Sequence, residues 1–275
     1  MQPNFTTLHV STCASSGVAT VTLAHGKGNA MSAHFFDECR LCFQLLARDT
    51  EVRAILLLAD GKYFTVGLDL KEAASNDNLS DTDDVARRYM RQRQHLLRLQ
   101  DAFSALELCP QPIIAAVHGA CVGGGIDLLC CCDIRLASEQ AWFTIKEVDV
   151  GLAADLGTLQ RLPKVVGNDS KVRELAYTAR RFGALEAKEI GFLGDVLPDR
   201  EALYAAAREM AELIAAKSPV AVVGTKANLN YARDHGVAEG LAYQAAWSGA
   251  ALQTEDLAKS FIASLNKEKA TYSKL

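Results

Sequence analysis

The chain has little of what nucleic-acid-binding and membrane proteins need. Its 275 residues carry a formal net charge of −4, which indicates no basic surface for nucleic acid or an anionic membrane. No apolar run approaches the ~20 residues of a membrane-spanning helix. Residues 1–12 lack both the apolar centre of a signal peptide and the arginine-rich pattern of an amphipathic presequence. We therefore expect no nucleic-acid partner, no membrane span and no N-terminal leader.

Cysteine spacing suited to a disulfide framework or a zinc site is also lacking. Cys130, Cys131 and Cys132 are consecutive in an apolar segment, which is a poor disulfide framework. Cys39 and Cys42 form one C-x-x-C pair without a second pair at zinc-finger spacing. Because this pair lies in a helical pattern, we expect buried thiols that pack as small apolar side chains. The eight cysteines indicate a reducing compartment, and no metal site is expected.

Three widespread catalytic sequence patterns are missing as well. The glycine-rich stretch in the middle of the chain does not supply G-x-G-x-x-G, which disfavours dinucleotide binding. No lysine follows these glycines as in a P-loop, and Gly224-Thr225-Lys226 lacks the upstream glycine. No serine lies in a G-x-S-x-G elbow, which disfavours a Ser–His–Asp triad. His118, next to Gly119, is interpreted as a turn residue rather than a catalytic one.

What the chain does contain is an apolar, glycine-rich stretch from Ile113 to Asp155. Residues 113–117 have strand length, and the chain then turns through the triplet Gly123–Gly125. If a helix begins at the triplet, its first N–H groups have no intrahelical partner and can bind an anion or a developing oxyanion. Asp127 would lie on the same face, one turn deeper. Close helix–strand packing, with Asp127 as a cap or ion-pair partner, explains the spacing equally well.

Among the carboxylates of this stretch, three are candidates for a functional role: Asp127, Glu147 and Asp155. Burying an unpaired carboxylate is costly, so each needs either a structural partner or a chemical role. For Glu147 the structural alternative is an ion pair with Lys146. For Asp155 it is an N-cap for a helix that begins at Leu156, which the position allows. Residue types and spacing alone leave both alternatives open.

The pattern of apolar residues predicts an α/β fold. Residues 6–10 and 18–23 alternate like strands, and Ser32 is a suitable N-cap for a helix that runs to about residue 47. Residues 54–59 form a continuous apolar run, typical of a strand buried on both faces. Strands that alternate with helices indicate βαβ units. Beyond residue 156 the pattern is mostly helical, with a break expected at Pro163.

A polar, acidic segment at residues 73–84 is predicted to be an exposed loop that could cover a pocket. A long helix is expected from Val85 onwards, with apolar residues at helical spacing. Its arginines could contact a phosphate, but charge runs are usually solvated faces, and a subunit contact would also suit them. These arginines are Arg87, Arg88, Arg91, Arg93 and Arg98.

Two sequence motifs, HGACVGGGIDL and CDIRLAS, resemble the crotonase (enoyl-CoA hydratase/isomerase) superfamily. The following stretch, KEVDVGLAADLGTLQRLPKVVGN, is similar to the dienoyl-CoA isomerase branch, which converts 3,5-dienoyl-CoA to 2,4-dienoyl-CoA in the β-oxidation of unsaturated fatty acids. The resemblance covers nearly the whole chain. It implies a spiral of ββα units over residues 1–200 and a C-terminal helical region, residues 201–275, that builds trimers, commonly paired as hexamers. Leu241, Ala245 and Trp247 would suit burial in such a contact.

The resemblance also implies roles for particular residues. Asp155 would take the proton from C2 of the substrate, Glu147 would protonate C6, and Asp127 would tune or orient the pair. The backbone N–H groups of Val66 and Gly124 would form the oxyanion hole, next to substrate-binding glycines at Gly67 and Gly123. No cofactor or metal is implied, because coenzyme A is part of the substrate.

Two other functions fit the same superfamily. Related hydratases carry glutamates at the positions of both Asp127 and Glu147, and this chain keeps only the second. Some superfamily members bind RNA, but the acidic charge balance argues against that role here. The chain ends in Ser273-Lys274-Leu275, which matches a receptor-read peroxisomal address. We therefore expect import into peroxisomes or a related organelle.

Overall fold

The computed structural model describes residues 4–75 and 84–275. A six-stranded sheet forms its centre, in the order β1-β2-β3-β4-β6-β9. Only β1 and β2 pair antiparallel; the other neighbours are parallel. The strands are β1 Leu8–Cys13, β2 Val18–Leu23, β3 Ala54–Ala59, β4 Ile113–Val117, β6 Ile134–Ser138 and β9 Asp195–Leu197. Every residue of β3 and β4 is buried, which confirms the prediction drawn from their continuous apolar runs.

A second, three-stranded sheet lies against the end of β4 and combines β5 (Ala120–Val122), β7 (Trp142–Thr144) and β8 (Phe182–Gly183). The chain passes from β4 to β5 at Gly119, whose φ is +63°. A Cβ there would lie 2.4 Å from the Lys62 carbonyl oxygen, so only glycine fits this crossing. The turn carries the chain from the main sheet into the glycine triplet.

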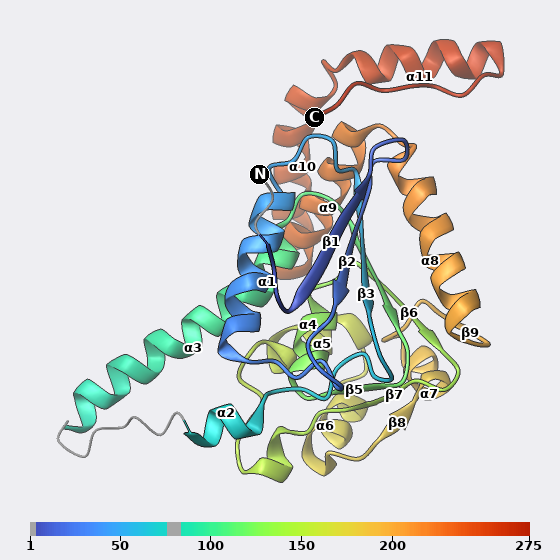
Figure 1. The fold of residues 1–275 in the computed structure, drawn as a ribbon. Helices are drawn as coiled ribbons and strands as arrows, with labels where there is room; N and C mark the ends of the chain where they lie inside the picture. The colour runs from blue at the N-terminus through green and yellow to red at the C-terminus, as the bar shows by residue number, and fades with distance from the viewer. Residues whose placement is uncertain (1–3, 76–83) are drawn as a thin grey trace.

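Helices cover both faces of the main sheet (Figure 1). One apolar core joins β1–β4 to α1 (Ala33–Leu46), α3 (Val85–Leu108) and α4 (Gly124–Cys130). On the other face, α8 (Arg200–Ala215) packs Leu203, Ala207, Ala211 and Ala215 against the strands. Helix α8 thus packs with the α/β core, although the predicted boundary at residue 200 grouped it with the C-terminal helices.

The remaining helices follow the predicted pattern with one exception. Helix α5 (Thr158–Val166) continues through Pro163, where a break was expected. Pro163 is only the sixth residue of α5, and because the first four N–H groups of a helix have no intrahelical partner, few hydrogen bonds of this short helix are affected by the proline. The others are α2 Leu70–Ser75, the 3₁₀-helix Glu147–Val150, α6 Asp169–Thr178, α7 Ala184–Glu189, α9 Pro219–Asp234, α10 Val237–Ala251 and α11 Glu255–Asn266.

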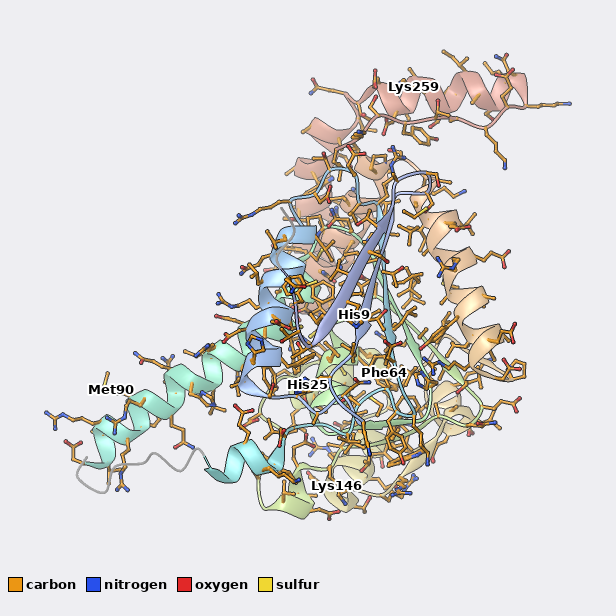
Figure 2. All side chains as sticks on the ribbon, viewed as in Figure 1. His9, His25, Phe64, Met90, Lys146 and Lys259 are labelled. Carbon is orange, nitrogen blue, oxygen red and sulfur yellow. The ribbon has the colours of Figure 1, made fainter. Side chains whose placement is uncertain are left out.

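Two helices extend away from the body. The first half of α3, which carries Met90, and α11, which carries Lys259, both project outward in Figure 2. Of the loop predicted at residues 73–84, the first three residues belong to α2, and residues 76–83 lie outside the described part of the chain. In the described ranges, no helix combines the length and apolar character that a membrane crossing requires.

The C-x-x-C pair is buried in the core, as its helical setting predicted. Cys39 and Cys42 are each 1% exposed on α1. Burial raises the pKa of the Cys42 thiol to about 12 and also raises that of Cys39 well above its ordinary value, so both remain protonated near neutral pH. Over residues 4–75 and 84–275, no three His, Cys, Asp or Glu side chains form a group able to hold a metal ion.

Candidate functional site

The glycine triplet brings α4 into close contact with its neighbours. Gly123, with φ +52°, ends the turn, and a Cβ on it would lie 3.1 Å from Oε1 of Glu147. A Cβ on Gly125 would lie 2.5 Å from Cγ2 of Thr65 and 2.7 Å from Sγ of Cys121. Close packing therefore requires Gly125, whereas Gly123 faces a carboxylate. The packing interpretation of the triplet is confirmed at Gly125, and the anion-binding interpretation stays a prediction.

Asp127 lies on α4 and is 1% exposed. Its Oδ1 accepts a hydrogen bond from the Thr158 backbone N–H at 2.6 Å, at the start of α5. Burial raises the pKa of Asp127 to about 6; the Thr158 hydrogen bond opposes this rise, and the charge of Asp155 adds to it. In the part of the chain that the structure describes, Asp127 has no ion-pair partner.

Glu147 begins the 3₁₀-helix that follows β7. Its Oε2 is buried and has no hydrogen-bond partner among the described residues. The ion pair considered with Lys146 does not form, because Lys146 pairs with Asp149 instead. Burial, and then the charges of Asp127 and Asp155, raise the pKa of Glu147 to about 7. This carboxyl can therefore hold or release a proton near neutral pH.

Asp155 precedes α5 but does not cap it. Helix α5 begins at Thr158 with Gly157 at the N-cap position, so the capping interpretation of Asp155 is wrong. The side chain is half-buried, and Nε2 of Gln100 donates a hydrogen bond to the Asp155 carbonyl oxygen at 2.7 Å. Burial raises the pKa of the Asp155 carboxyl, opposed by the charge of His95.

The three carboxylates therefore share one electrostatic environment. The charge of Asp155 raises the pKa values of both Asp127 and Glu147, and that of Asp127 raises the pKa of Glu147. Like charges act on one another this way only at short range in a poorly solvated site. Three separate segments of the chain, α4, the 3₁₀-helix and the residues before α5, thus contribute carboxyl groups to one site.

Backbone donors next to the carboxylates differ from the expected pair. The Val66 N–H donates to the Gly28 carbonyl oxygen at 2.9 Å, so it is not free to bind an oxyanion and the expectation for Val66 is wrong. The Gly67 N–H donates to Oγ1 of Thr65. Among the hydrogen bonds of the described residues, none uses the Leu68 N–H as a donor.

Met31 contacts both the segment that carries the free Leu68 N–H and the glycine triplet. Met31 pairs with Leu68 in a short parallel bridge, and its Sδ lies 3.2 Å from where a Cβ on Gly124 would be. Gly124 is the first residue of α4, so its N–H has no partner inside the helix. A Cβ on Gly67 would lie 2.8 Å from the Val122 carbonyl oxygen, which places this loop directly against β5. The geometry thus favours the N–H groups of Gly124 and Leu68 as a donor pair.

Other predicted and unpredicted residues support the site. His118 bonds to Gly61 through Nε2 and to the hydroxyl of Tyr204 through Nδ1, both at 3.1 Å, which fits its interpretation as a turn residue. Sequence analysis missed Gln100 and Thr158, which hold Asp155 and Asp127 respectively. Gln100 lies outside the motifs, and Thr158 lies within the stretch KEVDVGLAADLGTLQRLPKVVGN, but neither contact with a carboxylate can be read from the sequence pattern.

Comparison with known proteins places this geometry in a family. A family model described as enoyl-CoA hydratase/isomerase matches residues 13–274. The chain is 51% identical to human mitochondrial Delta(3,5)-Delta(2,4)-dienoyl-CoA isomerase, over 90% of this chain and 77% of that protein. It is 43% identical to the peroxisomal enzyme of the same name from Arabidopsis thaliana, over 90% and 89%.

Solved structures agree with the sequence comparisons. A putative enoyl-CoA hydratase from Streptomyces coelicolor A3(2) superposes with a TM-score of 0.89 at 29% identity, over 99% of this chain and 96% of the other. The enoyl-CoA hydratase from Bacillus anthracis gives a TM-score of 0.87 at 28% identity, over 97% and 99%. The fold is therefore the predicted crotonase-like α/β fold, and the chain belongs to the enoyl-CoA hydratase/isomerase family.

Proposed function

We propose that this protein is an isomerase that converts 3,5-dienoyl-CoA to 2,4-dienoyl-CoA. The observation that carries the proposal is the group of three carboxylates with raised pKa values and without ion pairs among the described residues. The relatives named dienoyl-CoA isomerase, at 43–51% identity, support the same substrate class. Coenzyme A is part of the substrate, and the reaction needs no redox change and no metal.

The reaction moves one proton along a conjugated chain. Asp155 takes a proton from C2, the electron pair delocalises over the thioester oxygen and the diene, and Glu147 gives a proton to C6. A pKa of about 7 lets Glu147 hold that proton at neutral pH. Asp127 acts on Glu147 through its charge. Substrate contacts with Gly67 and Gly123 complete this proposal, since both glycines adjoin the site.

Two backbone donors stabilise the oxyanion that forms on the thioester. We assign this role to Gly124, as the sequence predicted, and to Leu68 in place of Val66. Donors that are fixed before the reaction and excluded from water stabilise developing charge strongly. Both groups lie at Met31, on the side of α4 where the helix N-terminus contributes a positive dipole.

The proposal is tested by incubation with 3,5-dienoyl-CoA in D₂O. We expect an increase in the absorbance of the conjugated 2,4-dienoyl thioester and one solvent-derived deuteron at C6, located by mass spectrometry. An enzyme that leaves the diene unchanged but adds water to a 2-enoyl-CoA would instead be a hydratase, the nearest alternative. RNA binding, a more distant one, would appear in filter binding with a steep salt dependence.

Assembly into trimers or hexamers is a further part of the proposal. Helix α10 has no buried residue, yet much of its surface is apolar, and a helix that is apolar on all sides is normally covered. Leu241 is 66% exposed in the single chain, and Phe261 of α11 is 63% exposed. Light scattering at micromolar concentration should report three or six subunits; a monomer would contradict this proposal.

Import into peroxisomes is proposed from Ser273, Lys274 and Leu275. The relatives divide on this point, since the Arabidopsis enzyme is named peroxisomal and the human one mitochondrial. Leu275 is 45% exposed, so a receptor can reach its side chain. Deleting the three residues should leave a fluorescently tagged protein in the cytosol. Organellar import that continues unchanged would exclude the tripeptide as the signal.

A further inference from the structure

A polar cavity of about 500 Å³ lies behind the carboxylates, between α3, α5 and α9. Its lining includes Leu156 and Gly157, the two residues that follow Asp155. The other lining side chains are polar or charged, in contrast to the apolar core around α4. The cavity thus joins the acid–base site to α9, the first of the C-terminal helices.

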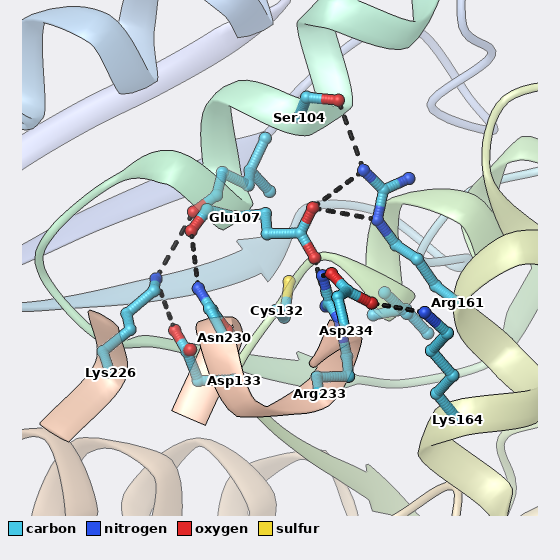
Figure 3. A network of polar contacts seen from close by, with 12 residues as sticks. Ser104, Glu107, Cys132, Asp133, Arg161, Lys164, Lys226, Asn230, Arg233 and Asp234 are labelled. Carbon is cyan, nitrogen blue, oxygen red and sulfur yellow. Dashed lines mark hydrogen bonds and ion pairs between the residues drawn. The ribbon is translucent and has the colours of Figure 1, made fainter. Parts of the chain in front are cut away.

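Glu107 of α3 is the centre of this cavity's ion pairs (Figure 3). Its Oε2 accepts hydrogen bonds from Nε of Arg161 at 3.1 Å and from Nη2 at 2.9 Å, while Oε1 accepts from Arg233. Its side chain is 14% exposed. Burial alone would raise the pKa of Glu107, but the two arginines hold it below the usual value, so the carboxylate stays charged.

Arg161 connects Glu107 to the start of α5. Its backbone N–H donates to the Gly157 carbonyl oxygen at 3.0 Å, within the first turn of the helix. Its Nη1 lies 2.0 Å from where a Cβ on Gly157 would be, so the guanidinium covers this glycine directly. Thr158, which follows Gly157, donates its backbone N–H to Oδ1 of Asp127. A shift of Arg161 would therefore move the turn that carries this donor.

Helix α3 holds the same turn at a second point, where Gln100 binds the Asp155 carbonyl oxygen at 2.7 Å. Gln100 and Glu107 are seven residues apart, two turns along one face of α3. The segment from Asp155 to Arg161 is thus fixed at both ends on one helix. The position of the Asp155 carbonyl group and the hydrogen bond from Thr158 to Asp127 both depend on this attachment to α3.

We propose that Glu107 is a positioning residue for the acid–base site, because its ion pair with Arg161 keeps the first turn of α5 in register with Asp127 and Asp155. Arg233 extends this attachment to α9, so docking of the C-terminal helices acts on the same turn. The inference rests on the proposed function, since it assigns Glu107 a part in that reaction. A displacement of ~1 Å far from the chemistry can cost ~10²-fold in rate.

The test compares Glu107→Gln with the matched control Lys164→Met. Lys164 lies on α5, lines the same cavity and pairs with Asp234 of α9, but does not contact Glu107. We expect Glu107→Gln to lower kcat for 3,5-dienoyl-CoA ~10- to 100-fold with KM changed less than ~3-fold. Lys164→Met should stay within ~2-fold of wild type in both constants, as expected for an exposed pair.

A second readout separates positioning from general destabilisation. Amide hydrogen exchange of residues 155–161 should speed up at least tenfold in Glu107→Gln, at a temperature where circular dichroism shows that the protein is folded. Arg161→Lys keeps the cation but loses the two-point contact, so it should show a smaller loss of the same kind. It also serves as the test variant if Glu107→Gln does not fold.

The outcomes distinguish the two proposals. Equal kcat and equal exchange in Glu107→Gln and Lys164→Met would overturn the role of Glu107. So would a loss of kcat without faster exchange in residues 155–161. If wild type does not isomerise the diene, the proposed function fails, and the exchange rates alone decide whether Glu107 fixes this turn.

Discussion

The buried or half-buried acids fall into two groups, Glu107 on the one hand and Asp127 with Glu147 on the other, which differ in their charged neighbours. Glu107 has two arginine partners, and its pKa lies below the usual value. Asp127 and Glu147 have no ion pairs among the described residues, and their pKa values rise to about 6 and about 7. Desolvation acts on all of them in the same direction, so burial does not explain the difference. The presence or absence of a cation does.

The same fold thus contains one carboxylate that is held charged by ion pairs, Glu107, and others whose raised pKa values suit proton transfer. Arg161 and Arg233 make Glu107 a permanent anion that can hold a helix in place. Near Glu147, the side chain that could have paired with it, Lys146, is engaged by Asp149. The acid–base site thus depends as much on the absence of an ion pair at Asp127 and Glu147, among the described residues, as on the carboxylates it contains.

The largest effect should follow from removing proton transfer itself. Asp155→Asn and Glu147→Gln keep the shape of each side chain but cannot exchange the proton. Each should lower turnover of 3,5-dienoyl-CoA by ~10²–10⁴, the usual contribution of a positioned acid or base. The rate of diene absorbance change measures the loss. A loss below tenfold in either variant would remove that residue from the mechanism.

The next effect concerns the oxyanion donors. Replacing the backbone amide of Leu68 by an ester removes its N–H and should lower turnover ~10²–10³-fold. The same replacement at Val66 removes only the hydrogen bond to Gly28, so turnover should stay within a few-fold of wild type. The reverse order of the two losses would restore Val66 as the donor.

Asp127→Asn should have a smaller effect, about tenfold on turnover, because its charge acts on its neighbours rather than on the substrate. The pH profile gives the sharper result. Glu147 must be protonated to act on C6, so activity falls as the pH rises through its pKa of about 7. Removing the charge of Asp127 lowers that pKa, and the alkaline limb of the profile should move to lower pH. An unmoved limb would show that the two carboxyls do not interact.

The smallest effect is on stability, and it should have opposite signs in the two groups of acids. Glu147 binds its proton more tightly in the folded state than at its ordinary pKa of 4.5, so stability falls as the pH rises from about 4.5 to about 7. Glu147→Gln removes this loss and should raise the free energy of unfolding at pH 8 by about 1–3 kcal/mol. Glu107→Gln removes the carboxylate partner of Arg161 and leaves Arg233 with Asp234 alone, so it should lower the free energy of unfolding by about 2–3 kcal/mol. Urea unfolding of both variants measures the two signs; the same sign in both would contradict the comparison.

The parts of the fold that the sequence predicts are those set by local pattern. Continuous apolar runs gave β3 and β4, and Ser32 does cap α1 by accepting the Phe35 N–H. Asp127, Glu147 and Asp155 were identified because carboxylates in an apolar stretch are unusual and because the spacing resembles a known superfamily. These signals can be read from the residue types and their spacing along one stretch of the chain.

The parts that the sequence did not predict depend on distant contacts. Thr158 and Asp127 are 31 residues apart, Gln100 and Asp155 are 55 apart, and Arg161 and Glu107 are 54 apart. The oxyanion donor in the loop after β3 was assigned to Val66 instead of Leu68. The hydrogen bonds of this loop are formed with Gly28 and Met31, which belong to an earlier segment of the chain. No local pattern encodes such pairs.

The central claim, isomerisation by a group of carboxylates that form no ion pairs among the described residues, is tested most directly by two rates in two proteins. Isomerisation of 3,5-dienoyl-CoA and hydration of crotonyl-CoA are measured for wild type and for Asp155→Asn. The account predicts isomerisation well above hydration in wild type, and its loss by ~10²–10⁴ in the variant. Rapid hydration of crotonyl-CoA by wild type, unchanged in Asp155→Asn, would contradict the claim and identify the protein as a hydratase.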